Sequence, residues 1–163
     1  MCNVTVYHGS TLVVEHPICM YGRPNLDFGQ GFYVTNLREQ ATEWALLVAG
    51  KRQAIPVLNK YVLCRDEILA NARCKIFKAY DIEWLEFIVS SRLGNNPSKD
   101  YDYIEGGIAN DRVIDTVNLF MAGLMDSATA LSRLAMHSPN NQMCLLNQEI
   151  TDKYLIFNET EAI

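Results

Sequence analysis

Short runs of β-branched and aromatic residues, separated by polar segments and turn signals, recur along the chain. The first is residues 3–7, NVTVY, in which polar and apolar side chains alternate before Gly9 interrupts the run. This alternation and composition are typical of β-strands. Similar runs predict further strands at residues 32–35, 55–64, 101–107, 142–147 and 153–159.

Helical spacing and capping residues predict two helices in the first part of the chain. Asn36 is placed to cap the first helix, and Glu39, three residues later, completes a capping-box pattern. Gly50 is expected to end this helix. Asp81 is expected to begin a second helix that runs to Arg92, with a stop at Gly94.

Two more helices are predicted in the second part. Asn110 or Asp111 would cap the first, and Ser127 would cap the second, which runs to Met136. Apolar stripes at helical spacing favour packing of the helices after Asn36 and Asn110 into the core. The stripe residues are Leu37, Ala41, Trp44, Ala45 and Val48, and Val113, Val117, Phe120, Met121 and Leu124.

The mixture of strands and helices, without strict alternation, predicts an α+β fold with largely antiparallel sheets. No internal repeat, low-complexity tract or linker divides the 163 residues, so we expect a single domain over residues 1–163. Hydrophobic residues make up 49% of the chain and charged residues 20%, which is an ordinary globular balance.

Composition also limits the classes of function. No run approaches the roughly 18 apolar residues of a membrane helix, and the start of the chain lacks signal-peptide features, so we expect a cytoplasmic protein without membrane contact. The net charge is −5, and no dense Lys/Arg cluster marks a nucleic-acid-binding stripe. A local patch that binds nucleic acid stays possible.

Cysteines and histidines do not form a metal-binding pattern. The five cysteines lack a C-x-x-C pair, which argues against zinc and against a disulfide framework, and the three histidines are scattered. We therefore expect reduced cysteines and no metal.

A glycine pair flanks Gln30 directly before the predicted strand at 32–35, in the stretch DFGQGFYVTN. Such a pair costs backbone entropy, so a tight turn or a close backbone approach should require it. One interpretation is an ordinary turn into a strand. The other is a loop that lets a small molecule lie against the backbone, with the Tyr33 ring available for stacking.

Several stretches taken together resemble a known enzyme class. YHGS, DFGQGFYVTNLREQATEWA, DYDYIEGGIANDRV and NNQMCLLN follow one another in the order found in the His-Tyr-Glu class of ADP-ribosyltransferases. That class includes the poly(ADP-ribose) polymerases and the diphtheria-type toxins. The same set is similar to a bacterial domain family of unknown function in that superfamily. The resemblance covers nearly the whole chain and implies two packed sheets flanked by helices.

The resemblance implies a site for NAD as substrate. The Gly9 backbone would pair with the nicotinamide carboxamide, and His8 would donate a hydrogen bond to the adenosine-side ribose. Tyr33, together with Trp44 eleven residues later, would sandwich the nicotinamide ring. Gln142 matches the position of the catalytic glutamate.

Further residues belong to the same expected site. Arg23 and Arg92 are candidates for the pyrophosphate, since a guanidinium group suits phosphate oxygens. The other residues expected to contact the cofactor are Ser10, Gly31, Phe32 and Thr35.

The site departs from the family pattern at Gln142, which carries no charge. Removing a group that stabilises transition-state charge costs about 3–4 kcal/mol in comparable cases. Other members of the superfamily replace this glutamate and still transfer single ADP-ribose units. Glu105 or Glu149 could supply the missing carboxylate, or both could be ordinary solvated side chains.

The function expected from the resemblance is mono-ADP-ribosyl transfer, with toxin-like or defence-like use, to an unidentified macromolecular acceptor, protein or nucleic acid. A small-molecule acceptor and a neutralising protein partner are also compatible with it. Two alternatives stay open: a degenerate module that binds NAD or ADP-ribose without chemistry, and a purely structural or protein-interaction domain. A ribonuclease-like toxin would need a second catalytic residue beside His8, and the sequence places none there.

Overall fold

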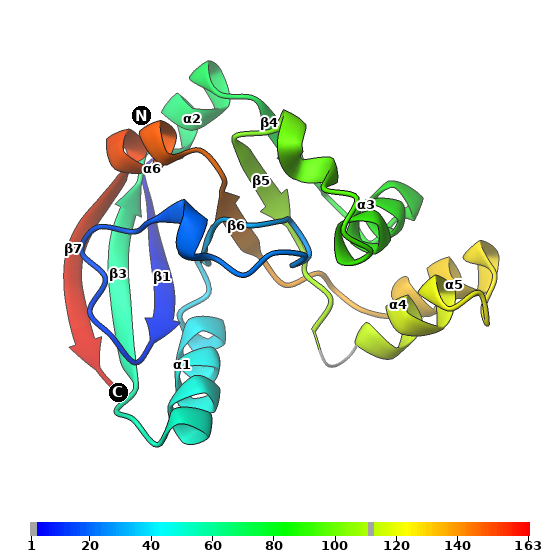
Figure 1. Ribbon diagram of the computed structural model, residues 1–163, viewed down its shortest axis with the longest axis horizontal. Helices are drawn as coiled ribbons and strands as arrows, with labels where there is room; N and C mark the ends of the chain where they lie inside the picture. Colours follow the sequence, from blue (N-terminus) through cyan, green and yellow to red (C-terminus); the bar gives the residue numbers. More distant parts are fainter. Residues whose placement is uncertain (1–2, 111–112) are drawn as a thin grey trace.

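The computed structural model describes residues 3–110 and 113–163, and these form an α+β fold of two mostly antiparallel sheets with helices around them (Figure 1). The predicted α+β class with largely antiparallel sheets is therefore confirmed. The first sheet has the order β1-β3-β7, all antiparallel. Its strands are β1 (Val4–Ser10), β3 (Val57–Leu63) and β7 (Leu155–Ala162).

The second sheet has the order β2-β6-β5-β4, in which only the pair β4–β5 is parallel. Its strands are β2 (Phe32–Val34), β4 (Cys74–Ile76), β5 (Tyr103–Gly106) and β6 (Gln142–Leu145). The two ladders meet at one isolated bridge in the described part of the chain, where Tyr7 and Thr35 exchange both backbone hydrogen bonds at 2.7 and 3.0 Å.

Six α-helices and two short 3₁₀ helices lie in the described residues. The α-helices are α1 (Arg38–Arg52), α2 (Arg65–Asn71), α3 (Ile82–Arg92), α4 (Ile114–Met121), α5 (Ser127–Leu134) and α6 (Gln148–Tyr154). The 3₁₀ helices are η1 (Cys19–Tyr21) and η2 (Pro97–Asp100). In Figure 1, α1 lies beside β1, whereas α4 and α5 lie at the far end from the first sheet.

Two apolar clusters hold these layers together. The first lies between the sheets and joins Val6 and Tyr61 of the first sheet to Phe32, Val34 and Leu145 of the second. The second lies on the other face of the second sheet, where Phe28, Ile104 and Cys144 pack with α3, α4 and α5. The second sheet is therefore covered on both faces, which explains its nearly continuous apolar strands.

The helix boundaries confirm one predicted cap and correct others. Asp81 caps α3, accepting from Trp84 N at 2.9 Å, and Gly94 follows with a φ of +85°. The capping box at Asn36 is wrong, because Leu37 is the N-cap of α1 and makes no side-chain bond. The same helix passes Gly50 and ends at Arg52.

The later helices also differ from the prediction. Asp126, not Ser127, caps α5 by accepting from Thr129 N at 2.7 Å. Val113 is the N-cap of α4, so the cap predicted at Asn110 is displaced, and Asp111 lies outside the described residues. The predicted core stripes hold for Val113 and Val117, which are buried, but Leu124 is exposed.

No helix among the described residues is both long enough and apolar enough to cross a bilayer.

Candidate functional site

Beyond the bridge between Tyr7 and Thr35, β1 has an open edge next to α1. Successive residues of a strand direct their backbone groups to alternate edges, so those of Gly9 point to the same edge as those of Tyr7, away from β3. In the described residues no backbone partner for Gly9 is found at that edge. Its N–H and C=O therefore lack a described backbone partner at this edge, although Gly9 itself is buried against α1.

Gly9 also lets α1 approach β1 closely. A Cβ at this position would lie 2.0 Å from the carbonyl oxygen of Ala41 and 2.9 Å from the nitrogen of Ala45. The absence of a side chain is thus required by packing, whatever binds at the edge. The face of α1 that rests here carries the small residues Ala41, Ala45 and Ala49.

The His8 ring is half-buried and fixed between two residues of β2. Its Nδ1 lies 2.8 Å from the carbonyl oxygen of Tyr33, and its ring centroid lies 4.4 Å from that of Phe32. Because a carbonyl only accepts, Nδ1 carries the proton. Burial lowers the pKa of His8, partly offset by this hydrogen bond, so the neutral ring is favoured. Nε2 is then an acceptor, whereas the resemblance implied a donor at His8.

Tyr33 is tied to the loop that precedes it. Its hydroxyl donates to the Gly29 carbonyl at 2.7 Å and accepts from Phe28 N at 3.1 Å. Its ring is parallel to that of Phe28, with centroids 6.5 Å apart. Burial raises the pKa of Tyr33 well above its ordinary value. The tyrosine therefore closes its own loop, and its ring already has an aromatic neighbour.

The glycine pair around Gln30 is explained by this loop. Gly29 has a φ of +93°, which other residues rarely adopt, and a Cβ on Gly31 would lie 2.5 Å from the carbonyl oxygen of Leu145 in β6. The Gln30 amide nitrogen donates to the carbonyls of Met20 and Gly22. The pair thus makes a tight turn, and Gly31 also allows the backbone of β6 to approach closely. The fold alone therefore accounts for both glycines, without a ligand.

Gln142 begins β6, beside the end of β2. Because strand side chains alternate between faces, Gln142 lies on the same face as Cys144. Cys144 is the cross-strand partner of Tyr33, so Tyr33 lies on that face too. The partner of Gln142 in β5 is Gly106, which has no side chain. The Oε1 atom of Gln142 is buried without a hydrogen-bond partner in the described residues. A buried orphan acceptor is rare and requires an explanation.

The N-terminal part of α1 contributes two more side chains. Gln40 contacts Asn141, the residue before Gln142 in the chain: its Nε2 lies 3.4 Å from the Asn141 carbonyl oxygen. Its own Oε1 is also buried without a partner in the described part of the chain. The sequence analysis missed Gln40, although its i, i+4 spacing from Trp44 places both on one helical face. Asn141 also donates to Asn36 Oδ1 at 2.7 Å, which joins β6 to the start of α1.

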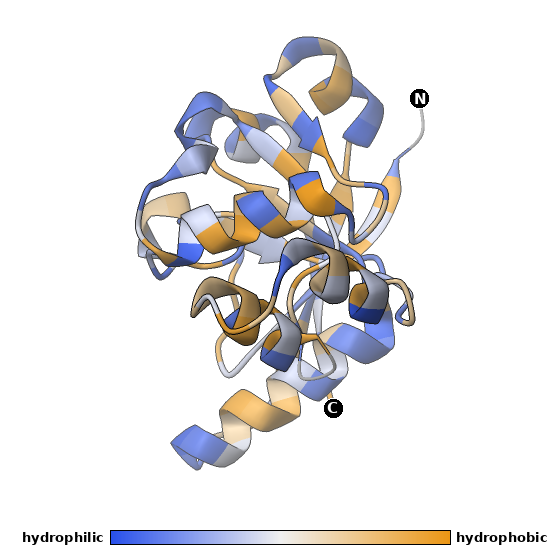
Figure 2. Ribbon diagram, turned by 90° about the vertical axis from the view of Figure 1, so that its right-hand side faces the viewer, coloured by the Kyte–Doolittle hydropathy of each residue, from blue (hydrophilic) through white to orange (hydrophobic). Residues whose placement is uncertain are grey.

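Trp44 lies on the surface and not in the core. It is 47% exposed, so the expectation that the whole stripe packs inside is wrong for this residue. Exposed apolar side chains continue along the helix at Leu46 and Leu47. In Figure 2, α1 is the helix at the bottom, hydrophobic in the middle and hydrophilic at its far end. A large exposed indole beside buried polar groups is typical of a binding surface.

The other predicted site residues lie in different surroundings. Phe32 is in the core between the sheets, and Thr35 is buried with its hydroxyl accepting from Leu37 N at 3.1 Å. The Ser10 hydroxyl accepts from Leu12 N at 3.2 Å at the end of β1. Arg23 is exposed in the loop before β2.

The charged groups considered for the site are engaged elsewhere or exposed. Arg92 forms an ion pair with buried Asp27 at 2.6 Å, so it is not free for a pyrophosphate. Glu105 accepts from Arg65 and from the Tyr103 hydroxyl, both at 2.8 Å. Glu149 is exposed on α6. Neither Glu105 nor Glu149 is thus a free carboxylate beside Gln142 in this structure.

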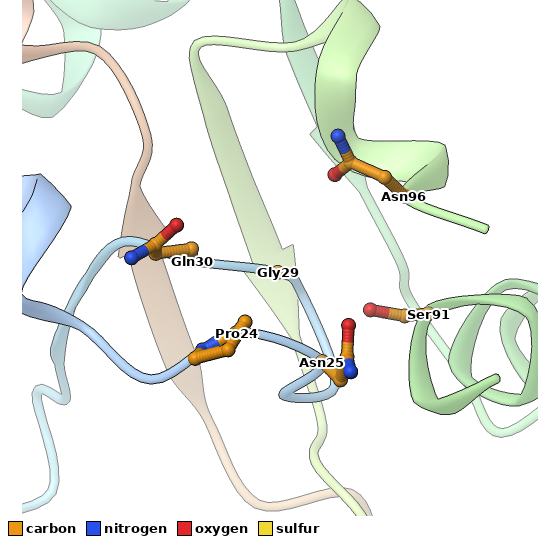
Figure 3. Close-up of a pocket in the computed structure, with 6 residues that line it drawn as sticks. All are labelled: Pro24, Asn25, Gly29, Gln30, Ser91 and Asn96. Carbon is orange, nitrogen blue, oxygen red and sulfur yellow. The ribbon is translucent and has the colours of Figure 1, made fainter. Parts of the chain in front are cut away.

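Two cavities border the loop before β2. One, of about 210 Å³, lies between the loop before β2 and the end of α3 (Figure 3). Its lining residues are Pro24, Asn25, Gly29, Gln30, Ser91 and Asn96. The other, of about 310 Å³, shares Gln30 and Asn96 with it and extends to Arg73 and Asp102. Neither of these two cavities is lined by His8 or Gln142.

Comparison with known proteins gives one match. The model of a family described as "Protein of unknown function (DUF3990)" matches residues 4–157, which is most of the chain. No curated protein and no solved structure matches the sequence.

Proposed function

Because the chain belongs to the DUF3990 family, whose description assigns no function, we propose a function from the site itself: transfer of a single ADP-ribose unit from NAD to a macromolecular acceptor. The observation that carries this proposal is the buried, unpartnered Oε1 of Gln142. It occupies the position that the resemblance gives to the catalytic glutamate. The open Gly9 edge and the exposed Trp44 flank the same region, and an ADP-ribosyltransferase-like fold is part of the proposal.

In this proposal, the open edge of Gly9 binds the nicotinamide carboxamide and Trp44 stacks on the ring. His8 accepts a hydrogen bond from a ribose hydroxyl through Nε2, because its Nδ1–H donates to the Tyr33 carbonyl. The bond between nicotinamide and ribose breaks with its electron pair leaving on the nicotinamide nitrogen. An acceptor nucleophile then attacks the ribose carbon and releases its proton to solvent.

Gln142 limits the rate of this reaction. Its amide oxygen can accept a hydrogen bond from a ribose hydroxyl, which orients the sugar. It supplies only a dipole where the family glutamate supplies a full negative charge, so the positive charge that develops on the ribose is stabilised less. We expect slow turnover by the natural protein.

The test is nicotinamide release from NAD by the natural protein and by Gln142→Glu. We expect slow release by the natural protein and at least a tenfold increase in the variant. Trp44→Ala should reduce release because it removes the stacking surface, whereas Leu47→Ala, also exposed on α1, should not. Absence of release from both the natural protein and Gln142→Glu would contradict the proposed reaction.

A second candidate is a module that binds NAD or ADP-ribose without chemistry. The engagement of Glu105 by Arg65 and Tyr103 favours it, because that nearby carboxylate is occupied. Saturable NAD binding without nicotinamide release would support this candidate over the transferase.

A further inference from the structure

The larger of the two cavities, of about 310 Å³, lies where four separate parts of the chain meet. Its lining includes Gln30 from the loop before β2, Arg73 directly before β4, Ser98 and Lys99 of η2, and Asn147, the N-cap of α6. Ligand pockets typically measure about 300–1,000 Å³, so this volume suits a small ligand.

Among the residues that line this cavity, Arg73 and Lys99 are cations and Asp102 is an anion. The buried Asp102 carboxylate accepts from Arg73 Nε at 3.1 Å and from Arg73 Nη2 at 2.9 Å. This pair fixes one edge of the guanidinium, and Nη1 has no partner in the described residues. The Lys99 ammonium likewise has no ion pair in the described part of the chain. One positive charge of the lining is therefore uncompensated, which favours an anionic group in the cavity.

Two amide side chains of the same lining are held in one orientation. Gln30 Nε2 donates to the carbonyls of Met20 and Gly22 at 2.8 and 2.9 Å, so its Oε1 is left as an acceptor. Asn96 Oδ1 accepts from the buried Ser98 hydroxyl at 3.1 Å, so its Nδ2 is left as a donor. A ligand hydroxyl both donates and accepts, so a hydroxylated ligand matches this lining.

The smaller cavity adjoins the larger one, because Gln30 and Asn96 line both (Figure 3). Three non-glycine residues of the described chain have a positive φ, and two of them line these cavities: Asn25 at +60° and Asn96 at +51°. The third, Gln53, is the C-cap of α1, where this conformation is common. Asparagine adopts it more readily than most residues, but such positions also cluster at ligand sites.

We propose that the larger cavity binds a small phosphorylated sugar, free or as part of a nucleotide. The phosphate binds the Lys99 ammonium and Nη1 of Arg73. A phosphate monoester carries about −1.5 to −2 charges at neutral pH and has three terminal oxygens, so it can engage both cations. The sugar hydroxyls bind Gln30 Oε1 and Asn96 Nδ2. This site does not depend on the proposed reaction, since neither His8 nor Gln142 lines it.

The test is titration calorimetry of the natural protein with ribose 5-phosphate, ribose and inorganic phosphate. We expect ribose 5-phosphate to bind at least tenfold more tightly than either of its parts. Lys99→Gln should weaken this binding at least tenfold, because it removes a cation that has no structural partner. Asn96→Gly should weaken it at least threefold, because glycine keeps the positive φ while the amide is lost.

Two variants on α1 are matched controls. Lys51→Gln removes an exposed lysine with the same change of net charge, and Gln53→Gly replaces another residue of positive φ. Neither residue lines the cavity, so both variants should bind ribose 5-phosphate within twofold of the natural protein. Trp44→Ala should also leave this binding unchanged, because Trp44 belongs to the candidate site on α1.

Three results would overturn the inference. These are absence of ribose 5-phosphate binding, equal affinity for inorganic phosphate, and affinity that is lost in Trp44→Ala or Lys51→Gln but kept in Lys99→Gln. Titration with AMP distinguishes the two forms of the ligand. Tighter binding of AMP than of ribose 5-phosphate would support a nucleotide, and weaker binding would support a free sugar phosphate. None of these measurements uses nicotinamide release, so the proposed reaction and this site fail or stand separately.

Discussion

At the scale of single residues, Tyr33 shows how one residue can position both a loop and a neighbouring side chain. Its hydroxyl bridges the Gly29 carbonyl and Phe28 N, while its own carbonyl holds His8 Nδ1. The loop before β2, the strand itself and the imidazole are therefore positioned by one residue. A substitution at Tyr33 that lowers activity need not mean that its ring contacts the ligand.

Tyr33→Phe isolates the hydroxyl. We expect the variant to unfold more easily by about 1–2 kcal/mol, because a half-buried loop loses two hydrogen bonds while its ring packing is kept. Urea unfolding measures this. Tyr21→Phe is the control, since Tyr21 is 85% exposed and its hydroxyl should contribute almost nothing. Equal stability of the two variants would contradict the bridging role.

Asp102 gives a prediction for the pH dependence of stability. Hydrogen bonds from Arg73, reinforced by Asn147, hold the pKa of this buried carboxyl at about 2, below its ordinary 3.8. A group whose pKa is lowered by folding stabilises the fold above its unfolded pKa, and this contribution disappears as the pH falls through the folded pKa.

The natural protein should therefore exceed Asp102→Asn in free energy of unfolding by about 1–3 kcal/mol near neutral pH, because hydrogen bonds to a charged group are lost in the variant. This difference should shrink between about pH 4 and pH 2. Urea unfolding at several pH values measures it. A difference that stays constant down to pH 2 would contradict the assignment.

At the scale of elements, the contact between β1 and α1 depends on Gly9. Gly9→Ala should destabilise the protein by at least about 2 kcal/mol, because its Cβ would lie 2.0 Å from a helix carbonyl oxygen and the helix must move. Gly50→Ala is the opposite case on α1, since nothing lies within 4 Å of its added Cβ. It should stabilise by about 0.5–1 kcal/mol. Thermal unfolding compares the two.

The same elements show what a sequence can and cannot predict. The six strands expected from β-branched runs exist. Asp81 was recognisable as a cap because its signal is local: its side chain accepts a hydrogen bond from Trp84 N, three residues later. The short elements α2, β4 and α6 were missed. Each has seven residues or fewer, too few to show a clear period, and depends on neighbours supplied by the rest of the fold.

The site was predictable only where its chemistry is local. Trp44 and Gln142 were assigned to the candidate site by residue type and order, but Gln40 was not considered, because a polar residue in the first turn of a helix normally faces water. Its contact is with Asn141, 101 residues away, which the sequence does not show. Arg92 was assigned to phosphate because its ion pair with Asp27, 65 residues away, could not be seen in the sequence.

At the scale of the whole molecule, this ion pair connects distant parts. Asp27 also accepts from Ala109 N at 2.6 Å, so it joins the loop before β2, α3 and the segment after β5. Arg92→Leu should cost about 3 kcal/mol or more, because it leaves a buried carboxylate unpaired. Arg38→Leu breaks a solvent-exposed pair of the same 2.6 Å length and should cost much less than Arg92→Leu. Urea unfolding of both variants tests this contrast, and similar losses would contradict it.

The bridge between Tyr7 and Thr35 has a consequence for how the two sheets move. Because the described backbone ladders meet only there, the amide protons of these two residues report on any separation of the sheets. Hydrogen–deuterium exchange at these two amides would follow that separation directly. A ligand bound across the Gly9 edge would add a second connection between the two sheets. It would slow the exchange of both amides together, without contacting either of them.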